Sequence, residues 1–164
     1  MVYIDELADW ALERWTMDDF HGLPHWQRVE TNGIRLCAVS NVHDNSEEIP
    51  DLMVVRCFAY LHDAGRMSIH EDPKHGLRSA EIAATIRDTI LRDLSDEQFE
   101  KLVIACREHT RTQRTGDITI DTCFDADRLD LPRAGIIPDP KKMATEAGAE
   151  IARKEFWNNE NEII

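Results

Sequence analysis

The sequence places a histidine directly before an aspartate, His62 and Asp63, at the end of the apolar segment LMVVRCFAYL (52–61). An imidazole and a carboxylate on a buried helix are costly unless something pairs with them. A divalent cation would do so, because both groups are good ligands for one. The alternative is a satisfied pair at a helix C-terminus, where a protonated histidine interacts favourably with the helix dipole. For the dipeptide alone, this alternative is the better interpretation.

Further histidines lie at or near the ends of predicted helices, where side chains from different elements can line one cleft. Of the seven histidines, four have this position: His25, His62, His75 and His109. The segments around them read HGLPHW (21–26), LHDAGR (61–66), EDPKHGLRSA (71–80) and REHT (107–110), and DADRLDL (125–131) follows. A histidine, a His-Asp doublet and a distal aspartate in this order favour a shared metal site over a chance dipeptide.

This arrangement resembles the HD-domain superfamily of metal-dependent phosphohydrolases, over about residues 21–133. The resemblance implies that the metal ligands are His25, His62, Asp63 and Asp127. Many members of the superfamily have two more histidines between the doublet and the last aspartate, which hold a second metal while the doublet aspartate bridges. His75 and His109 match those two positions in order and context. The alternative for each is a place behind the ligands or in substrate binding.

The ligand types restrict the metal. Two to four imidazoles with one or two carboxylates suit Mn, Fe, Co, Ni or Zn better than Mg or Ca, which prefer oxygen ligands only. Zinc alone would usually take fewer ligands. We therefore expect one or two divalent transition-metal ions, with Mn or Fe favoured in a two-metal site.

Basic residues close to the expected ligands favour an anionic substrate, because arginine forks match phosphate oxygens. Arg66 and Arg78 are the preferred candidates for phosphate contact, and Lys74 lies between them in sequence. The predicted reaction is hydrolysis of a small phosphorylated metabolite, such as a nucleotide, by metal-bound hydroxide. Asp63 would bridge or orient the metals, Arg66 would stabilise phosphoryl charge, and His109, if not a ligand, would be the general acid.

Two other functions use the same residues. Some relatives with the same six ligand types hold two irons and use oxygen to oxidise or cleave a small substrate, and the ligand set does not separate that chemistry from hydrolysis. A non-catalytic metal-binding module is the third possibility. The basic residues favour phosphate chemistry, and no GxSxG, Walker or GxGxxG motif offers a competing site.

The other polar residues of these segments are expected to have lesser roles. Only one member of DADRLD should face a metal, because residues two or three apart on a helix point in different directions. The resemblance selects Asp127, so Asp125 and Asp130 are predicted to be solvated or paired with Arg128 or Arg133. Arg128 is predicted to be structural.

Four residues remain near the site or on predicted loops. His21 is expected to line the cleft or to lie behind the ligands, and Trp26 to pack in the core. His43 and His70 are expected on the surface.

The periodicity of apolar residues predicts an all-α, single-domain bundle of about six to seven helices around a metal cleft, over residues 1–164. Expected helices cover 4–15, 24–40, 52–61, 75–91, 95–109, 118–129 and a C-terminal 143–157. The apolar run at 52–61 could also be a strand, and the surrounding helical signals favour a helix. Ser95 and Gln98 match a capping box at the start of their helix.

Charge and cysteine content limit the partners and the compartment. The formal net charge of −13 argues against nucleic acid, because nucleic-acid binders usually carry a basic footprint. No apolar stretch is long enough for a membrane span, and the N-terminus does not resemble a signal peptide. The four cysteines lie in apolar stretches without CxxC spacing, which predicts buried free thiols and a cytoplasmic protein. Apolar residues near both termini could cover a dimer surface, which is compatible with a homodimer.

Overall fold

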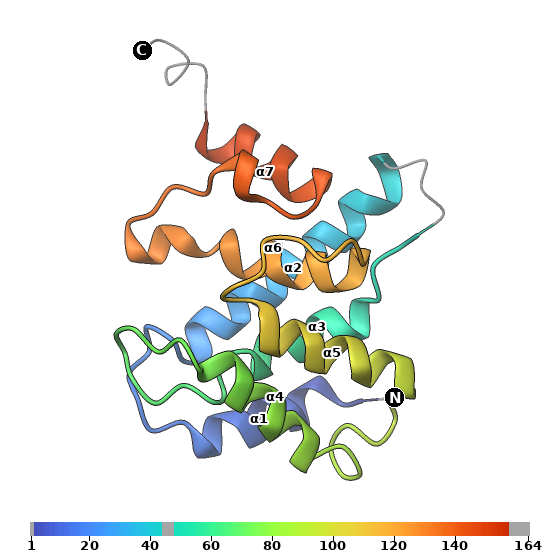
Figure 1. Cartoon of the computed structure of the whole chain (residues 1–164), viewed down its shortest axis with the longest axis vertical. Coiled ribbons are helices and arrows are strands. Elements are labelled where there is room, and N and C mark those ends of the chain that lie inside the picture. The colour runs from blue at the N-terminus through green and yellow to red at the C-terminus, as the bar shows by residue number, and fades with distance from the viewer. Residues whose placement is uncertain (1, 44–47, 158–164) are drawn as a thin grey trace.

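A computed structural model describes residues 2–43 and 48–157, with the side chains of 41–43 left aside. Within these ranges the chain is all-α and contains no strand (Figure 1). The elements are α1 (Ile4–Arg14), α2 (Leu23–His43), α3 (Leu52–Leu61), α4 (His75–Thr85), α5 (Asp96–Glu108), α6 (Ile118–Arg128), the short 3₁₀ turns η1 (Leu131–Ala134) and η2 (Pro140–Lys142), and α7 (Glu146–Phe156). The predicted all-α, single-domain bundle is confirmed.

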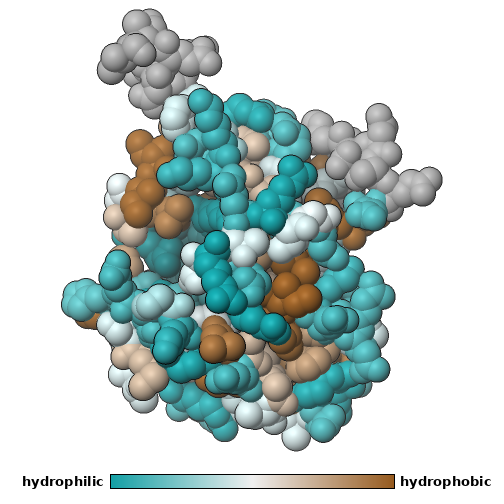
Figure 2. Space-filling model, viewed as in Figure 1, coloured by the Kyte–Doolittle hydropathy of each residue, from teal (hydrophilic) through white to brown (hydrophobic). Residues whose placement is uncertain are grey.

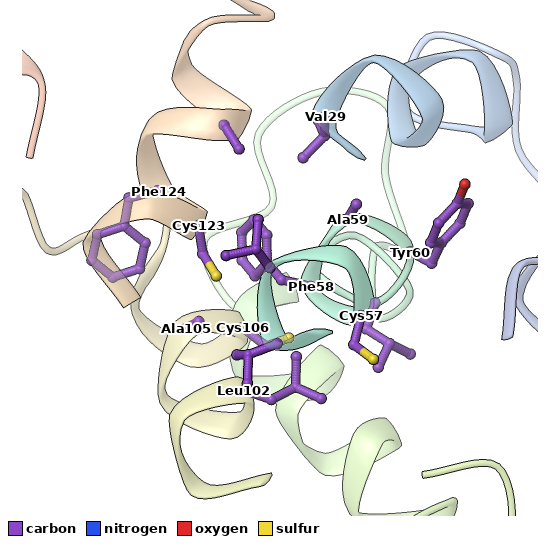
Figure 3. Packing of buried hydrophobic residues seen from close by; sticks show 14 of the residues in the cluster. Val29, Cys57, Phe58, Ala59, Tyr60, Leu102, Ala105, Cys106, Cys123 and Phe124 are labelled. Atoms are coloured by element: carbon purple, nitrogen blue, oxygen red, sulfur yellow. The ribbon is translucent and has the colours of Figure 1, made fainter. Parts of the chain in front are cut away.

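Helix α3 forms the centre of the bundle. It packs against α2, α5 and α6, with α1 and α4 also in contact with it. Seven of its ten residues are buried, including Phe58 and Leu61, which have no exposed surface. Around it, Val29, Leu102 and Phe124 come from three other helices and close the apolar core (Figure 3). Asp51 caps its first turn by accepting from the backbone N–H groups of Met53 and Val54.

Several helix ends agree with the sequence. The Ser95–Gln98 capping box is present: the Ser95 hydroxyl accepts from the Gln98 N–H at 3.1 Å, and the Gln98 side chain accepts from the Ser95 N–H at 2.9 Å.

The predicted core residues are also buried. Trp26 is completely buried and lies edge-on to Trp15 at 5.2 Å. All four cysteines are free and buried.

The helix expected over 75–91 was predicted too long. Helix α4 ends at Thr85, and the chain continues to residue 94 in turns, in which the Leu91 N–H reaches the Ile86 carbonyl at 3.0 Å. β-Branched residues cluster at 85–90 and weaken the helix, and the Arg87 guanidinium donates to the Leu91 and Leu94 carbonyls. Leu77 in this helix is 46% exposed, whereas His75 and Gly76 face the interior.

The ends of the other helices differ by a few residues. Helix α2 begins at Leu23 rather than Pro24 and extends to His43, so His43 belongs to the helix and its side chain lies outside the described part. The last helix covers 146–156 rather than 143–157, because Thr145 caps it by accepting from the Gly148 N–H. On the face shown in Figure 2, hydrophilic side chains predominate and the apolar ones form separate patches. No helix in the described ranges is long and apolar enough to cross a membrane.

Candidate metal centre

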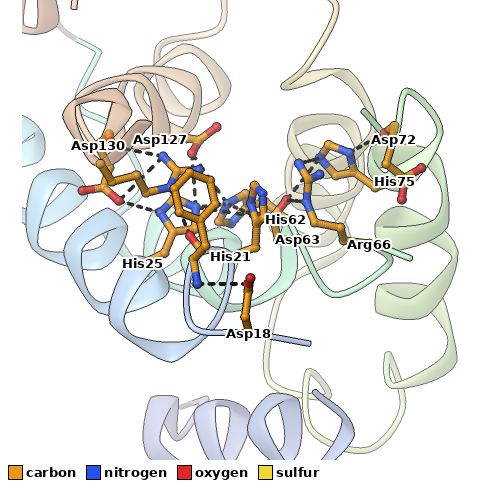
Figure 4. A network of polar contacts seen from close by, with 12 residues as sticks. Asp18, His21, His25, His62, Asp63, Arg66, Asp72, His75, Asp127 and Asp130 are labelled. Atoms are coloured by element: carbon orange, nitrogen blue, oxygen red, sulfur yellow. Dashed lines mark hydrogen bonds and ion pairs between the residues drawn. The ribbon is translucent and has the colours of Figure 1, made fainter. Parts of the chain in front are cut away.

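Five helices bring the predicted ligands to one place. His25 lies in the first turn of α2, His62 caps the C-terminus of α3, and Asp63 follows directly. His75 is the first residue of α4, His109 caps the C-terminus of α5, and Asp127 lies in the last turn of α6. Figure 4 shows the resulting network of polar contacts, which runs from Asp130 and His25 through His62 and Asp63 to Arg66 and His75.

The close contact of α4 with the end of α3 fixes the His-Asp doublet. The Ser79 hydroxyl donates to the His62 carbonyl at 2.6 Å and accepts from the Gly65 N–H at 2.9 Å. A Cβ atom at Gly65 would lie 2.4 Å from the Ser79 backbone nitrogen, so only glycine allows this approach. The glycine of LHDAGR therefore has a packing role that places His62 and Asp63.

The first group of ligand atoms surrounds a single point. His25 Nε2 lies 3.0 Å from His62 Nε2, and each of these nitrogens lies 3.7 Å from Asp63 Oδ2. Asp127 Oδ1 lies 3.4 Å from His25 Nε2 and 3.7 Å from His62 Nε2. Ligands at about 2.1 Å from one ion are about 3.0 Å apart at right angles and about 3.4 Å apart at tetrahedral angles. These four side chains could therefore hold one ion with only small shifts.

A second group shares Asp63. His75 Nε2 lies 2.9 Å from His109 Nε2 and 3.1 Å from Asp63 Oδ1. Because the first group uses Oδ2 and the second uses Oδ1, the Asp63 carboxylate lies between the two and could bridge a pair of ions. Both groups consist of buried side chains whose ligand atoms all lie within 4.8 Å of one another: His25, His62 and Asp63, and Asp63, His75 and His109.

The hydrogen bonds of the four histidines decide where their protons are. In each ring Nδ1 faces an oxygen that can only accept, so Nδ1 carries the proton and a neutral ring keeps a lone pair on Nε2. The Nδ1 partners and distances are Asp130 Oδ2 at 2.6 Å for His25, the Ala59 and Phe58 carbonyls at 3.1 and 3.2 Å for His62, the Asp72 carbonyl at 2.6 Å for His75, and the Cys106 carbonyl at 2.7 Å for His109.

Burial favours the neutral form of two of these imidazoles. It lowers the pKa of His62 to about 3 and also lowers the pKa of His109. When both rings of a pair are neutral, the Nε2 lone pairs of His25 and His62, and those of His75 and His109, point at each other across 3.0 and 2.9 Å. Two facing lone pairs repel, and a cation shared between them, either a proton or a metal ion, relieves this repulsion.

The carboxylates remain ionised in this environment. Burial alone would raise the pKa of Asp63, but the positive charge that His62 carries when protonated, the hydrogen bond from His21 and the charge of Arg66 hold that pKa well below its usual value. Burial likewise opposes ionisation of Asp127, but the positive charge that the surrounding imidazoles carry when protonated outweighs it, so the pKa of Asp127 is also lowered. The Asp127 side chain is 23% exposed, whereas those of His25, His62 and Asp63 are at most 3% exposed. Solvent therefore reaches this group of ligands on the Asp127 side.

Residues near the ligands have clear structural partners. His21 donates from Nδ1 to Asp63 Oδ2 at 3.1 Å and is buried, which agrees with a place behind the ligands. The Arg66 side chain, 11% exposed, donates from Nε to Asp63 Oδ1 at 3.2 Å. Arg78 binds both Asp72 carboxylate oxygens and the Gly65 carbonyl, and Lys74 is exposed. Of the three predicted phosphate-binding residues, Arg66 is the one that contacts the centre.

Two aspartates have functions that the sequence did not reveal. The expected ion pairs Asp125–Arg128 at 3.4 Å and Asp130–Arg133 at 3.7 Å are present, but both carboxylates are buried rather than solvated. Asp125 mainly accepts from Ala144 and Thr145 and so ties α6 to the start of α7.

Asp130 accepts the His25 proton and two bonds from Arg28, at 2.7 and 3.1 Å. Helical spacing suggested that it points away from the centre, but α6 ends at Arg128 and the following turn brings Asp130 back to His25. No periodic signal could have indicated this contact.

Two further predictions on polar residues agree with the structure. Arg128 donates to the carbonyls of Thr112, Gln113 and Lys142, as expected for a structural residue, and His70 is exposed.

Two cavities of about 290 and 310 Å³ are lined by residues other than the ligands, one beside η2 and α7 and one between α1 and α4. The cleft expected over the ligands therefore stays a prediction.

Comparison with known proteins adds no relative. No protein-family model matches the chain, and neither a curated protein nor a solved structure matches it. Membership of the HD-domain superfamily therefore stays a prediction.

Proposed function

We propose that this protein is a metal-dependent phosphohydrolase of the HD-domain kind that acts on a small phosphorylated metabolite such as a nucleotide. The observation that carries the proposal is the convergence of four Nε2 lone pairs on two points joined by the Asp63 carboxylate. Two neutral imidazoles in this arrangement repel each other, and a shared cation relieves the repulsion. His25, His62, Asp63 and Asp127 would hold one ion, and His75, His109 and Asp63 a second.

The donor set suits a transition metal. Imidazole nitrogen with carboxylate oxygen favours Mn, Fe, Co, Ni or Zn over Mg and Ca. A bound ion of this kind supplies Lewis acidity, which lowers the pKa of water and withdraws charge from a phosphoryl oxygen. Residues of the chain provide the rest: the ligands position the centre, and Asp127 stands where solvent and substrate can approach.

Arg66 supports phosphate as the group that reacts. Its guanidinium is the basic group that lies against Asp63, and planar guanidinium forks bind phosphate oxygens in pairs. It would orient the substrate phosphate and stabilise the charge on it during reaction. His109 has Nδ1 bound to the Cys106 carbonyl and Nε2 turned to His75, which favours the role of a ligand over that of a general acid.

The test combines metal analysis with a substrate panel. Protein expressed with Mn, Co or Ni should contain at least one ion per chain and should hydrolyse members of a panel of nucleotides and sugar phosphates. Asp127→Asn should lose metal and activity, and Arg66→Gln should raise KM more than Lys74→Gln does, because Lys74 is exposed. Metal-loaded protein that hydrolyses no phosphate ester would overturn the proposal. Oxygen uptake by an iron-loaded sample would instead support the oxygenase alternative.

A further inference from the structure

Arg66 lies against the ligand atoms of the second group. Its Nε donates to Asp63 Oδ1 at 3.2 Å, and its Nη2 lies 3.5 Å from His75 Nε2. These two acceptors are two of the three ligand atoms that the second group offers, the third being His109 Nε2. The Arg66 cation therefore meets the same lone pairs that a second divalent ion would use (Figure 4).

The loop that follows the doublet holds Arg66 in this place. Its Nη1 donates to the Ser68 and His70 carbonyls at 3.3 and 3.2 Å. The Met67 N–H in turn donates to Asp72 at 2.8 Å, which closes the loop onto the start of α4. All three guanidinium nitrogens thus have partners, and displacing Arg66 costs several hydrogen bonds.

The first group is built differently. Arg66 contacts Asp63 through Oδ1, whereas the first group uses Oδ2. His25 is backed by the Asp130 carboxylate, which strengthens it as a ligand, and Asp127 adds a second carboxylate. The two halves of the centre therefore differ in both donor strength and competition from a cation of the chain.

We propose that Arg66 competes with the second ion for Asp63 Oδ1 and His75 Nε2. The first group then binds its ion tightly, and the second group binds an ion when Arg66 binds a phosphate instead. This rests on the proposed metal centre and adds a regulation to it. A phosphate offers the guanidinium charged acceptors in the paired geometry that it prefers, which leaves Asp63 Oδ1 and His75 Nε2 free for the ion. By linkage, the second ion and phosphate must then raise each other's affinity by the same factor.

Calorimetric titration of the metal-stripped protein with Mn²⁺ or Co²⁺ tests this, with inorganic phosphate as the anion. The wild type should bind one ion tightly and a second weakly. Arg66→Met keeps the length of the side chain but removes the charge. It should raise the affinity for the second ion by about tenfold or more, because the ligands of the second group are then no longer occupied by Arg66. Phosphate should tighten the second ion in the wild type and have little effect in Arg66→Met. Arg66→Lys should lie between the two, because it keeps the charge without the fork.

Arg111→Met is the matched control. Arg111 follows His109 by two residues, but its side chain is 62% exposed and pairs with Glu108 rather than with a ligand. Its loss removes a nearby charge and should leave both ion affinities unchanged. Equal second-ion affinity in the wild type, Arg66→Met and Arg66→Lys, or no effect of phosphate on the wild type, would overturn the inference and leave the metal centre intact. A wild type that binds no ion would instead overturn the proposed function.

Discussion

Replacement of Asp130 by asparagine tests whether this carboxylate strengthens His25 as a metal ligand. Asp130 Oδ2 accepts the His25 Nδ1 proton at 2.6 Å, and this carboxylate increases the electron density that His25 offers from Nε2. Loss of such a carboxylate costs about 10- to 100-fold in metal affinity. The amide oxygen of an asparagine could still accept the proton but carries no charge. We therefore expect the metal affinity to fall about tenfold in Asp130→Asn and about a hundredfold in Asp130→Ala. These factors equal about 1.4 and 2.7 kcal/mol of binding free energy.

Loss of the ion pair with Arg28 contributes little to this effect. The Arg28 side chain is 47% exposed and can be solvated when its partner is removed. Arg28→Met keeps the Asp130–His25 hydrogen bond and should therefore retain most of the metal affinity. The assay is competition with a chromophoric chelator, at a Co²⁺ concentration that loads only the tighter group of ligands.

Asp125→Asn provides the matched control, because Asp125 is another buried aspartate in the same DADRLD segment. Its carboxylate accepts from the Ala144 N–H at 2.7 Å and from the Thr145 N–H and hydroxyl at 2.8 Å. Its replacement should lower the free energy of unfolding by about 1–3 kcal/mol and leave the metal affinity of the folded protein unchanged. The reasoning is refuted if Asp130→Asn binds Co²⁺ as tightly as the wild type, or if both variants weaken binding equally.

Three further predictions follow from the burial and packing of named residues. The pKa of His62 is about 3 in the folded protein and about 6.5 in the unfolded chain, so the metal-stripped protein should lose stability as the pH falls from 6.5 towards 3. The loss for this group is up to about 1.4 kcal/mol per pH unit. Urea titrations at several pH values should show that the free energy of unfolding depends less steeply on pH in His62→Gln. Gly65→Ala should lower the free energy of unfolding by about 1–3 kcal/mol in a thermal melt and weaken metal binding, since its Cβ would meet the Ser79 backbone at 2.4 Å and move the doublet; equal stability would contradict the close approach. Burial raises the pKa of Cys37 to about 11 and that of Cys57 to about 12, so a thiol reagent at pH 8 should label them only at the rate of unfolding, and rapid labelling of the native protein would show that they are accessible.

Features with a local physical cause could be predicted from the sequence. The Ser95–Gln98 capping box sets the start of α5, and the apolar periodicity gives seven helices close to their observed places. The end of α4 could not be predicted, because it depends on Arg87 bonding to carbonyls that the turns expose. The roles of Ser79 and Gly65 depend on the packing of two helices and have no signature in a single segment.

The candidate site divides in the same way. The resemblance to the HD-domain superfamily selects six side chains, and the fold brings all of them together. The partners of the arginines could not be foreseen: Arg66 and Arg78 have similar positions in sequence, but Arg66 contacts Asp63 while Arg78 is bound by Asp72. Charge near a ligand in sequence therefore does not determine which cation reaches the centre.

Asp130 does for His25 what nearby carbonyls do for the other three histidines. At the C-terminal end of a helix the last carbonyls lack partners within the helix, so His62 and His109 can donate Nδ1 to carbonyls three or four residues earlier and turn Nε2 outward. His75 uses the Asp72 carbonyl of the preceding turn in the same way. His25 lies in the first turn of α2, and its Nδ1 is bonded to a side chain rather than to a carbonyl of its own segment. The turn after α6 brings the Asp130 carboxylate to it from 105 residues away.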